Sequence, residues 1–242
     1  ISRKWLYIGI LTMIGLAFFL YLSKESDELK DAVETSGALS LPLSGKVIVI
    51  DPGHGGPDGG AVGADDTLEK DIALETSKVL RDYLQGQGAL VYMTRETDKD
   101  LADEGTKGLS RRKSEDIRKR VQFIRDLEPD FFLSIHLNAI PSSRWSGAQT
   151  FFYPSLEESE HLAKFIQSEI TSSLNNTIRK AQAINNVYVL KHAGAPGALV
   201  EIGFLSNPNE RELLKTEKYQ EQMAASIYNG VLRFVTEEKF PE

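Results

Sequence analysis

Four residues of this chain are of metal-binding types and lie where an α/β sheet would bring them together. His54 lies in the segment IDPGHGG at positions 50–56, directly after an apolar run, and His136 and Glu201 lie near the ends of two later apolar runs. Glu69 opens the helical pattern that follows the first run. Two imidazoles, one carboxylate and a water form a common catalytic zinc set. The residues are far apart in sequence, so only the fold can assemble them.

The composition of the chain excludes several kinds of site and partner. The chain of 242 residues has no cysteine, which excludes disulfides, thiolate zinc sites and cysteine nucleophiles. Any metal must therefore be held by histidine and carboxylate side chains, which suit Zn²⁺. The net charge of −7 argues against nucleic acid as a partner, because phosphate binding needs concentrated positive charge.

His54 and Glu69 each have a second interpretation. His54 can simply fill a tight turn, because Asp51-Pro52-Gly53 already has the composition of one. Glu69 falls three residues after Asp66, the spacing of a capping box at a helix start. The sequence does not separate these local roles from metal binding.

His136 lies in an alternating segment, Phe131–Asn138. Its odd positions are all apolar, and its even positions end in Ser134, His136 and Asn138. Alternation therefore places His136 and Asn138 on one face of a strand, near its end. A strand with one exposed face gives the same pattern, so both interpretations stand.

Glu201 interrupts a segment, Ala198–Phe204, that is otherwise apolar on both faces. Such strands are buried, and a carboxylate there is costly unless it is paired or bound to a metal. The alternative to a functional role is a buried ion pair with an arginine such as Arg95 or Arg120.

The remaining histidines carry weaker signals. His161 lies in a charged helical stretch and is expected to be solvated, and His192 lies in a loop rich in glycine and proline that can line a site. Positions 100–108 form an irregular insertion, a feature that is often functional in compact domains. The basic residues that follow, up to position 120, are interleaved with acids and predict a solvated helix face first and a partner surface second.

The elements alternate along the chain. Strands are expected at 46–51, 89–94, 131–138, 147–153, 187–190 and 198–204, and helices at 66–84, 111–127, 156–174 and 218–234. This alternation predicts an α/β fold with an open, largely parallel mixed sheet of about six strands flanked by helices.

The amino-terminal segment predicts a transmembrane helix. Residues 5–23 carry no charge, and a helix of that length spans roughly 28 Å, about the hydrocarbon core of a bilayer. Arg3 and Lys4 precede it, which places the rest of the chain outside the cytoplasmic membrane. Bulky Tyr21 and Leu22 favour an uncleaved anchor over a signal peptide. We expect an anchor or signal segment at 1–23, a linker at 24–45 and a catalytic domain at 46–242.

Four motifs together resemble a known family. VIVIDPGHGGPDGGAVG, the glutamate of LEKDIALE, SIHLNA and GALVEIGFLSNPNE occur in that order, as in the zinc-dependent N-acetylmuramoyl-L-alanine amidases of the type-3 class. The resemblance covers about residues 46–235. The insertion at 100–120 is most similar to members that act on spore cortex.

This resemblance implies a mechanism and a setting. It implies Zn²⁺ held by His54, Glu69 and His136, with Glu201 as the catalytic residue; further candidate substrate contacts are Asn138, Arg95 and His192. The expected substrate is the peptidoglycan amide between the muramic acid lactyl group and L-alanine, cleaved outside the membrane as a step toward muramic-δ-lactam. An activating protein partner is an additional expectation.

Two other functions remain open at this point. One is a zinc exopeptidase on a related α/β scaffold, which would need an arginine beside the metal to bind a terminal carboxylate. The other is a non-catalytic module that binds the cell wall, which a missing ligand would indicate.

Overall fold

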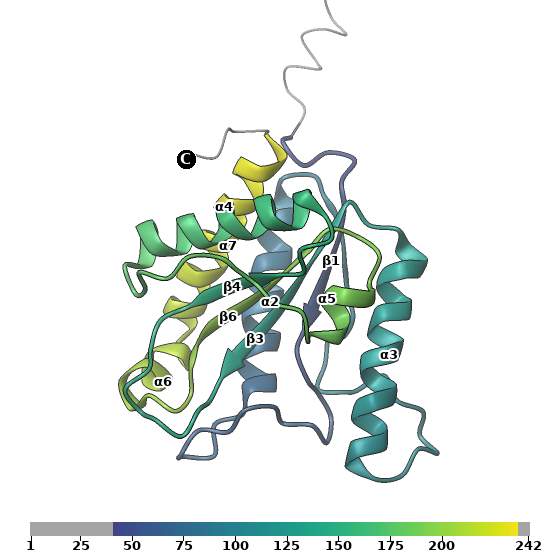
Figure 1. The fold of residues 1–242 in the computed structure, drawn as a ribbon, viewed down its shortest axis with the longest axis vertical. Helices are drawn as coiled ribbons and strands as arrows, with labels where there is room; N and C mark the ends of the chain where they lie inside the picture. Colours follow the sequence, from purple (N-terminus) through teal and green to yellow (C-terminus); the bar gives the residue numbers. More distant parts are fainter. Residues whose placement is uncertain (1–40, 237–242) are drawn as a thin grey trace, which may run out of the picture. The chain divides into compact units, whose positions relative to one another are not determined.

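The computed structural model describes residues 41–236 of the chain (Figure 1). The predicted transmembrane segment 1–23 and all but the last residues of the predicted linker 24–45 lie outside the described residues. Within 41–236, every helix is too short or too polar to cross a membrane.

Within the described residues, six strands form one sheet and six helices pack around it. The strands are β1 Val47–Pro52, β2 Leu90–Met93, β3 Phe131–Asn138, β4 Gln149–Phe152, β5 Gln182–Ala183 and β6 Gly197–Phe204. The helices are α2 Glu69–Gly86, α3 Leu109–Leu127, α4 Glu157–Leu174, α5 Tyr188–His192, α6 Pro208–Leu214 and α7 Glu217–Val235.

The strand order is β2-β1-β3-β6-β4-β5. Neighbouring strands are parallel except β4 and β6, which are antiparallel. The prediction of a largely parallel mixed sheet is therefore confirmed. From β1 the chain first adds β2 on one side of β1 and then crosses over to add β3 on the other side. The strand order therefore reverses between β1 and β3, and α/β sheets open a crevice for ligands at such a switch point.

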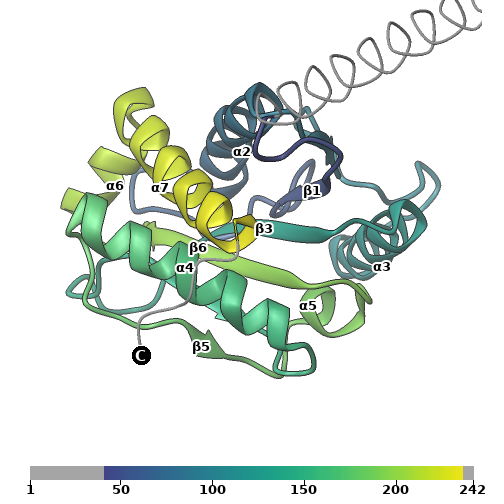
Figure 2. The ribbon, with the colours of Figure 1, turned by 90° about the horizontal axis from the view of Figure 1, so that it is seen from above.

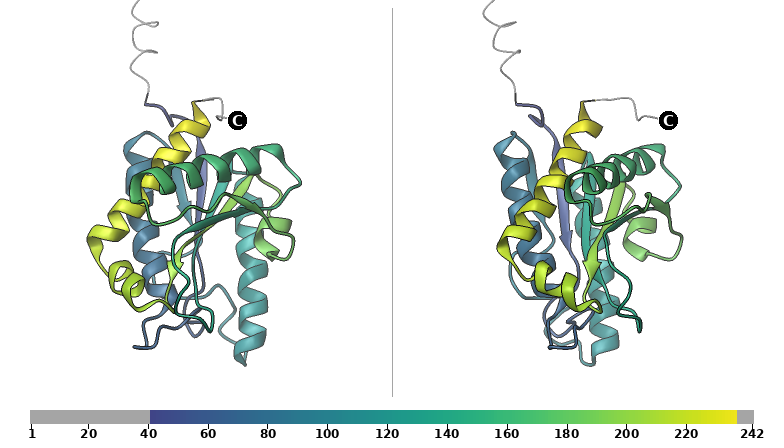
Figure 3. Two further views of the ribbon diagram at one scale, coloured as in Figure 1. Left: turned by 60° about the vertical axis from the view of Figure 1, so that its left-hand side comes forward. Right: turned by 90° about the vertical axis from the view of Figure 1, so that its left-hand side faces the viewer.

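Helices cover both faces of the sheet (Figure 2, Figure 3). Helices α2, α4 and α7 pack on one face and form the larger core with alternate strand residues such as Ile48, Leu133 and Val200. Helices α3 and α5 cover the other face over a smaller core, which includes Val49, Phe132 and Leu199. Because side chains alternate along a strand, Asp51, His136 and Glu201 share the α3–α5 face.

The structure corrects several predicted elements. The strand expected at 187–190 does not form: residues 188–190 lie in helix α5, and Val187 is the extended residue just before it. The sheet instead includes the short strand β5, which the sequence analysis missed. The short apolar run of this segment fits a strand and a buried helical turn equally well. It forms a helix because it packs against α3. Helix α6 was also missed, although Asn207 caps it by accepting a hydrogen bond from the Glu210 amide and Pro208 occupies its first turn.

Candidate metal centre and active site

His54 follows β1 in a turn that needs glycine on both sides. The Gly53 amide donates to the carbonyl of Ile135 on β3, which continues the ladder between the strands for one more residue. A Cβ at Gly53 would lie 2.4 Å from Cε1 of His136, so only glycine lets the His136 ring approach. His54 itself has φ 60°, a left-handed conformation that is uncommon for a non-glycine residue and is found at functional sites.

Glu69 is the first residue of α2, and its carboxylate is fully engaged. Oε2 accepts from the Ala61 amide at 2.7 Å and Oε1 accepts from the Leu137 amide at 2.9 Å. The capping-box interpretation is wrong, because the helix begins after Leu68 and has no side-chain cap. Asp66 instead has φ 64°, in the preceding loop. The carboxylate is thus aimed away from its own helix.

The three predicted ligands converge. His136 Nδ1 lies 2.8 Å from Glu69 Oε1, and His54 Nε2 lies 3.2 Å from Glu69 Oε2. One ligand atom from each residue lies within 4.8 Å of the others. A Cβ at Gly60 would lie 2.5 Å from Glu69 Oε2, so the loop closes directly on the cluster.

The donor set of this cluster fits a divalent metal. Burial opposes protonation of His54, but the hydrogen bonds that its ring donates to Asp58 and Glu69 outweigh burial and raise the His54 pKa to about 9. Burial likewise opposes the charge of Glu69, yet His136 and His54 hold its pKa well below its usual range. A proton on His54 thus balances the charge of the Glu69 carboxylate, and a metal ion would take the place of that proton. Two imidazoles with one carboxylate suit Zn²⁺.

Glu201 lies beside this cluster because β3 and β6 pair in parallel with His136 opposite Glu201. Its Oε2 is buried and has no hydrogen-bond partner among the described residues. Burial raises the Glu201 pKa to about 7, against the attraction of His136 and His54. A carboxyl group with this pKa exchanges a proton near neutral pH, as general acid–base chemistry requires.

The alternative explanation of Glu201 as an arginine ion pair is wrong. Arg95 is 1% exposed and donates to the carbonyls of Pro52, Gly53, Lys70 and Thr97. Arg120 is 2% exposed and binds Asp51, Asp116 and the carbonyls of Pro52 and His54. Both arginines instead hold the backbone of the His54 turn in place.

Asp51, near the end of β1, supports the His54 turn through its hydrogen bonds. Its carboxylate accepts from Thr94 Oγ1 and Arg120 Nη1, each at 2.7 Å, and from Ser134 Oγ at 2.8 Å. Burial disfavours its charge, but Arg120 and the Thr94 hydrogen bond lower its pKa to about 2. Asp51 is therefore a charged support for the ligand turn, with its oxygens already used.

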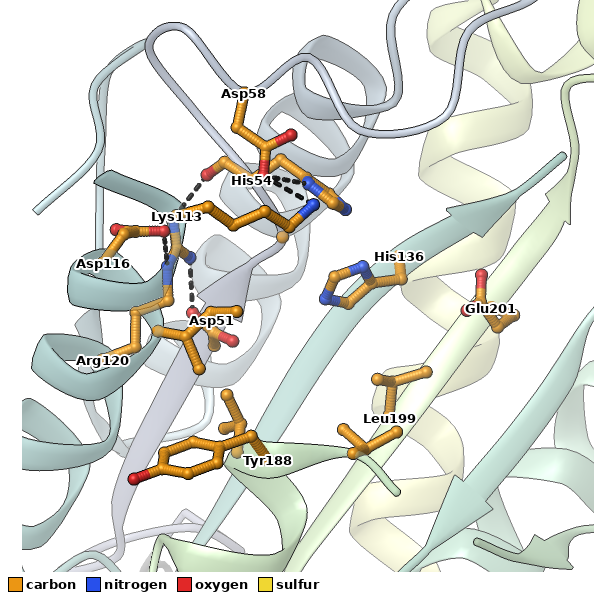
Figure 4. A pocket seen from close by; sticks show the side chains of 14 residues that line it. Asp51, His54, Asp58, Lys113, Asp116, Arg120, His136, Tyr188, Leu199 and Glu201 are labelled. Atoms are coloured by element: carbon orange, nitrogen blue, oxygen red, sulfur yellow. Dashed lines mark hydrogen bonds and ion pairs between the residues drawn. The ribbon is translucent and has the colours of Figure 1, made fainter. Parts of the chain in front are cut away.

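A pocket of about 260 Å³ opens over these groups, between the sheet and helices α3 and α5 (Figure 4). Its sheet side includes His54, His136 and Glu201, and His136 lies between the other two in Figure 4. Its outer walls include Lys113 and Ile117 of α3 and the partly exposed Tyr188 of α5.

The structure does not place the three candidate substrate contacts in the lining of this pocket. Arg95 is buried behind the His54 turn. Asn138 follows a shift in the β3–β6 register, so its pairing no longer continues that of His136. His192 is not in the pocket lining, and its ring centroid lies 4.3 Å from that of Tyr188. His161 is exposed on α4, as expected.

Asp58 is a candidate functional residue that the sequence analysis missed. Its Oδ2 lies 2.9 Å from His54 Nδ1 and 3.0 Å from Lys113 Nζ. A carboxylate that accepts the Nδ1 proton fixes the tautomer that leaves Nε2 for a metal. The signal was weak, because an aspartate in a loop rich in glycine usually serves the turn itself.

We expect Asp58→Asn to lower the affinity for Zn²⁺ by about 10-fold to 100-fold, the usual effect of losing such a support. Competition with a chelating dye measures the affinity, and circular dichroism checks the fold. Asp66→Asn is the matched control, because Asp66 is an exposed aspartate in the same loop. Unchanged affinity in Asp58→Asn would show that His54 needs no such partner.

The raised pKa of Glu201 also predicts how the stability of the protein depends on pH. Its pKa is raised from 4.5 to about 7, so the folded state retains a proton that the unfolded state releases, and the free energy of unfolding falls as pH rises through this interval. We expect Glu201→Gln to stabilise the chelated protein by up to about 3 kcal/mol near pH 8 and by little near pH 5. Urea denaturation at both pH values measures this. An equal gain at both would refute the titration of Glu201.

Comparisons with known proteins identify the family. Residues 48–233 match the N-acetylmuramoyl-L-alanine amidase family. The chain is 54% identical over 238 residues to the germination-specific N-acetylmuramoyl-L-alanine amidase of Bacillus subtilis (strain 168), covering 98% of this chain and 97% of that relative. It is 38% identical to the CwlD amidase of Clostridioides difficile, whose solved structure is a complex with the GerS lipoprotein, over 80% of this chain and 100% of that one, with a TM-score of 0.78. An N-acetylmuramoyl-L-alanine amidase from Clostridium difficile 630 gives 30% identity and a TM-score of 0.71, over 80% of this chain and 98% of that one. The chain belongs to the N-acetylmuramoyl-L-alanine amidase family.

Proposed function

We propose that this cell-wall amidase is zinc-dependent, with His54, Glu69 and His136 as the ligands and Glu201 as general base and acid. Its reaction is hydrolysis of the amide between the lactyl group of N-acetylmuramic acid and L-alanine in peptidoglycan. The observation that carries the proposal is that the three ligand atoms lie within 4.8 Å of one another, beside a buried carboxyl oxygen of Glu201 that has no hydrogen-bond partner within residues 41–236.

Each residue of the site has a separate role in the proposed reaction. A bound zinc ion supplies positive charge that polarises the scissile carbonyl and lowers the pKa of a water. Glu201 takes the proton of the attacking water and returns it to the departing amine nitrogen of L-alanine. Asp58 holds His54 in one tautomer, and Arg95 and Arg120 keep the ligand turn from shifting.

We extend the proposal to the setting of the enzyme. The name of the Bacillus subtilis relative, a germination-specific amidase, supports a role in germination. With the insertion at 100–120, it supports action on the spore cortex, on the way to muramic-δ-lactam. The uncharged segment 5–23 supports an anchor at 1–23 and a linker at 24–45, with the catalytic domain 46–242 outside the cytoplasmic membrane. The Clostridioides difficile complex supports a protein partner as a further proposal.

Digestion of cortex muropeptides tests the reaction. Full-length protein in detergent, loaded with Zn²⁺, should release peptides that begin with a free L-alanine amino group. Mass spectrometry identifies the products, and the metal content is measured on the same sample. Treatment with a chelator should abolish the release, and added Zn²⁺ should restore it. Cleavage within the peptide would reject the amidase mechanism.

The exopeptidase alternative loses its main support in the structure. It needs an arginine beside the metal, but Arg95 and Arg120 are buried and donate to backbone carbonyls and aspartates. The wall-binding alternative needs a lost ligand, whereas all three ligands and Glu201 come together among residues 41–236. A panel of free peptides beside intact muropeptides separates these functions.

A further inference from the structure

The pocket has two cationic side chains in its lining, and they differ in what they have left to bind. Arg120 has a side chain that is 3% exposed, and its guanidinium donates to two aspartates and two carbonyls. Lys113 has a side chain that is 45% exposed and, within the described part of the chain, one ion pair, with Asp58. A lysine ammonium carries three donors. Lys113 therefore offers free donors on an exposed ammonium, whereas Arg120 has most of its donors taken and its side chain is buried.

Lys113 is also close to the reacting centre. Its Nζ lies 3.0 Å from Asp58 Oδ2, and the same oxygen lies 2.9 Å from Nδ1 of the metal ligand His54. Figure 4 shows the lysine extending from α3 beside His54, on the side of His136 that is opposite Glu201. Lys113 Nζ is thus no more than about 6 Å from the ring of His54, the length of about two extended residues at roughly 3.5 Å each, so a substrate group bound by Lys113 lies a short stretch of chain from the metal ligands.

The chemistry of the substrate indicates which group Lys113 would bind. The lactyl carboxyl of muramic acid is consumed in the scissile amide, so the sugar on that side carries no charge. The peptide side begins with L-alanine, and its next residue is a glutamate or the corresponding carboxamide. An anion near the cleaved bond therefore belongs to the residue after L-alanine.

We propose that Lys113 is a specificity-determining residue that binds the free carboxylate of the residue after L-alanine and selects it over the carboxamide. This inference rests on the proposed amidase function. A carboxylate gains a charge-assisted hydrogen bond from the ammonium, whereas a carboxamide gains only a neutral acceptor. Because Lys113 is partly exposed, salt screens the interaction.

A pair of matched substrates tests the proposal. Two muramyl peptides that differ only in a carboxylate or a carboxamide at that residue are cleaved by the full-length zinc enzyme. We expect the wild type to prefer the carboxylate about tenfold in kcat/KM, mainly through KM, and to lose part of this preference at high salt. Lys113→Met should remove the preference, and Lys113→Arg should keep most of it.

The controls separate selection from support of the site. Arg118→Met removes an exposed cation from the same helix and should leave the preference unchanged. If Lys113 acts only by positioning Asp58, Lys113→Met lowers cleavage of both substrates equally, together with zinc content, and the proposal is wrong. A wild type that cleaves both substrates equally also overturns it while the amidase function stands. A wild type that cleaves neither refutes the amidase function itself.

Discussion

Glu201→Gln is expected to lower kcat for muropeptide hydrolysis by about a thousandfold, within the range of about 10²–10⁴ that a general base supplies. Glutamine keeps the size of the side chain and removes the proton-accepting oxygen. The buried Oε2 of Glu201 makes no hydrogen bond among the described residues, so the substitution breaks no protein contact at that atom. Zinc content and KM should therefore change little.

The pH profile adds a second measurement to this variant. Burial raises the Glu201 pKa to about 7 without a metal, and a cation in the site draws it back down. Wild-type kcat/KM should rise with pH through a pKa below about 7, because the base must be ionised. The glutamine variant should lack this limb. Turnover at the wild-type rate with zinc still bound would remove Glu201 from the mechanism.

His136→Ala is expected to abolish both metal binding and activity. Structural zinc sites bind with an apparent free energy of about 10–16 kcal/mol over four ligands, so one ligand accounts for roughly 2.5–4 kcal/mol, or about 70-fold to 1,000-fold in affinity. The lost imidazole also leaves Glu69 Oε1 without its partner at 2.8 Å. Activity should fall to the background of chelated wild type.

Metal analysis after gel filtration measures the zinc retained by His136→Ala. His161→Ala is the matched control, because His161 lies on α4 with a side chain that is 47% exposed and outside the metal cluster. It should keep one zinc and full activity. If His136→Ala retained zinc with wild-type affinity, the ligand set proposed here would have to be replaced.

Several features of this protein follow from local patterns. Alternation and burial determined β3, which the structure places at Phe131–Asn138 as predicted, and β6 begins only one residue earlier than expected. Glu201 was identified as a functional residue because it interrupts an apolar strand, where desolvation makes an unpaired charge costly. The absence of cysteine restricted the metal to histidine and carboxylate ligands, which are those that converge.

Other features were decided by tertiary contacts. Glu69 has the spacing of a helix cap, but two backbone amides and two histidines from elsewhere in the fold take its carboxylate. Residues 188–190 became helical because that apolar run packs against α3. Asp58 and Lys113 acquired their places only when α3 came to lie beside the His54 turn. Periodicity and composition report which side chains are buried and how each segment folds, because these depend on near neighbours. Which distant polar atoms meet depends on strand order and register, and these are set by the packing of the whole sheet.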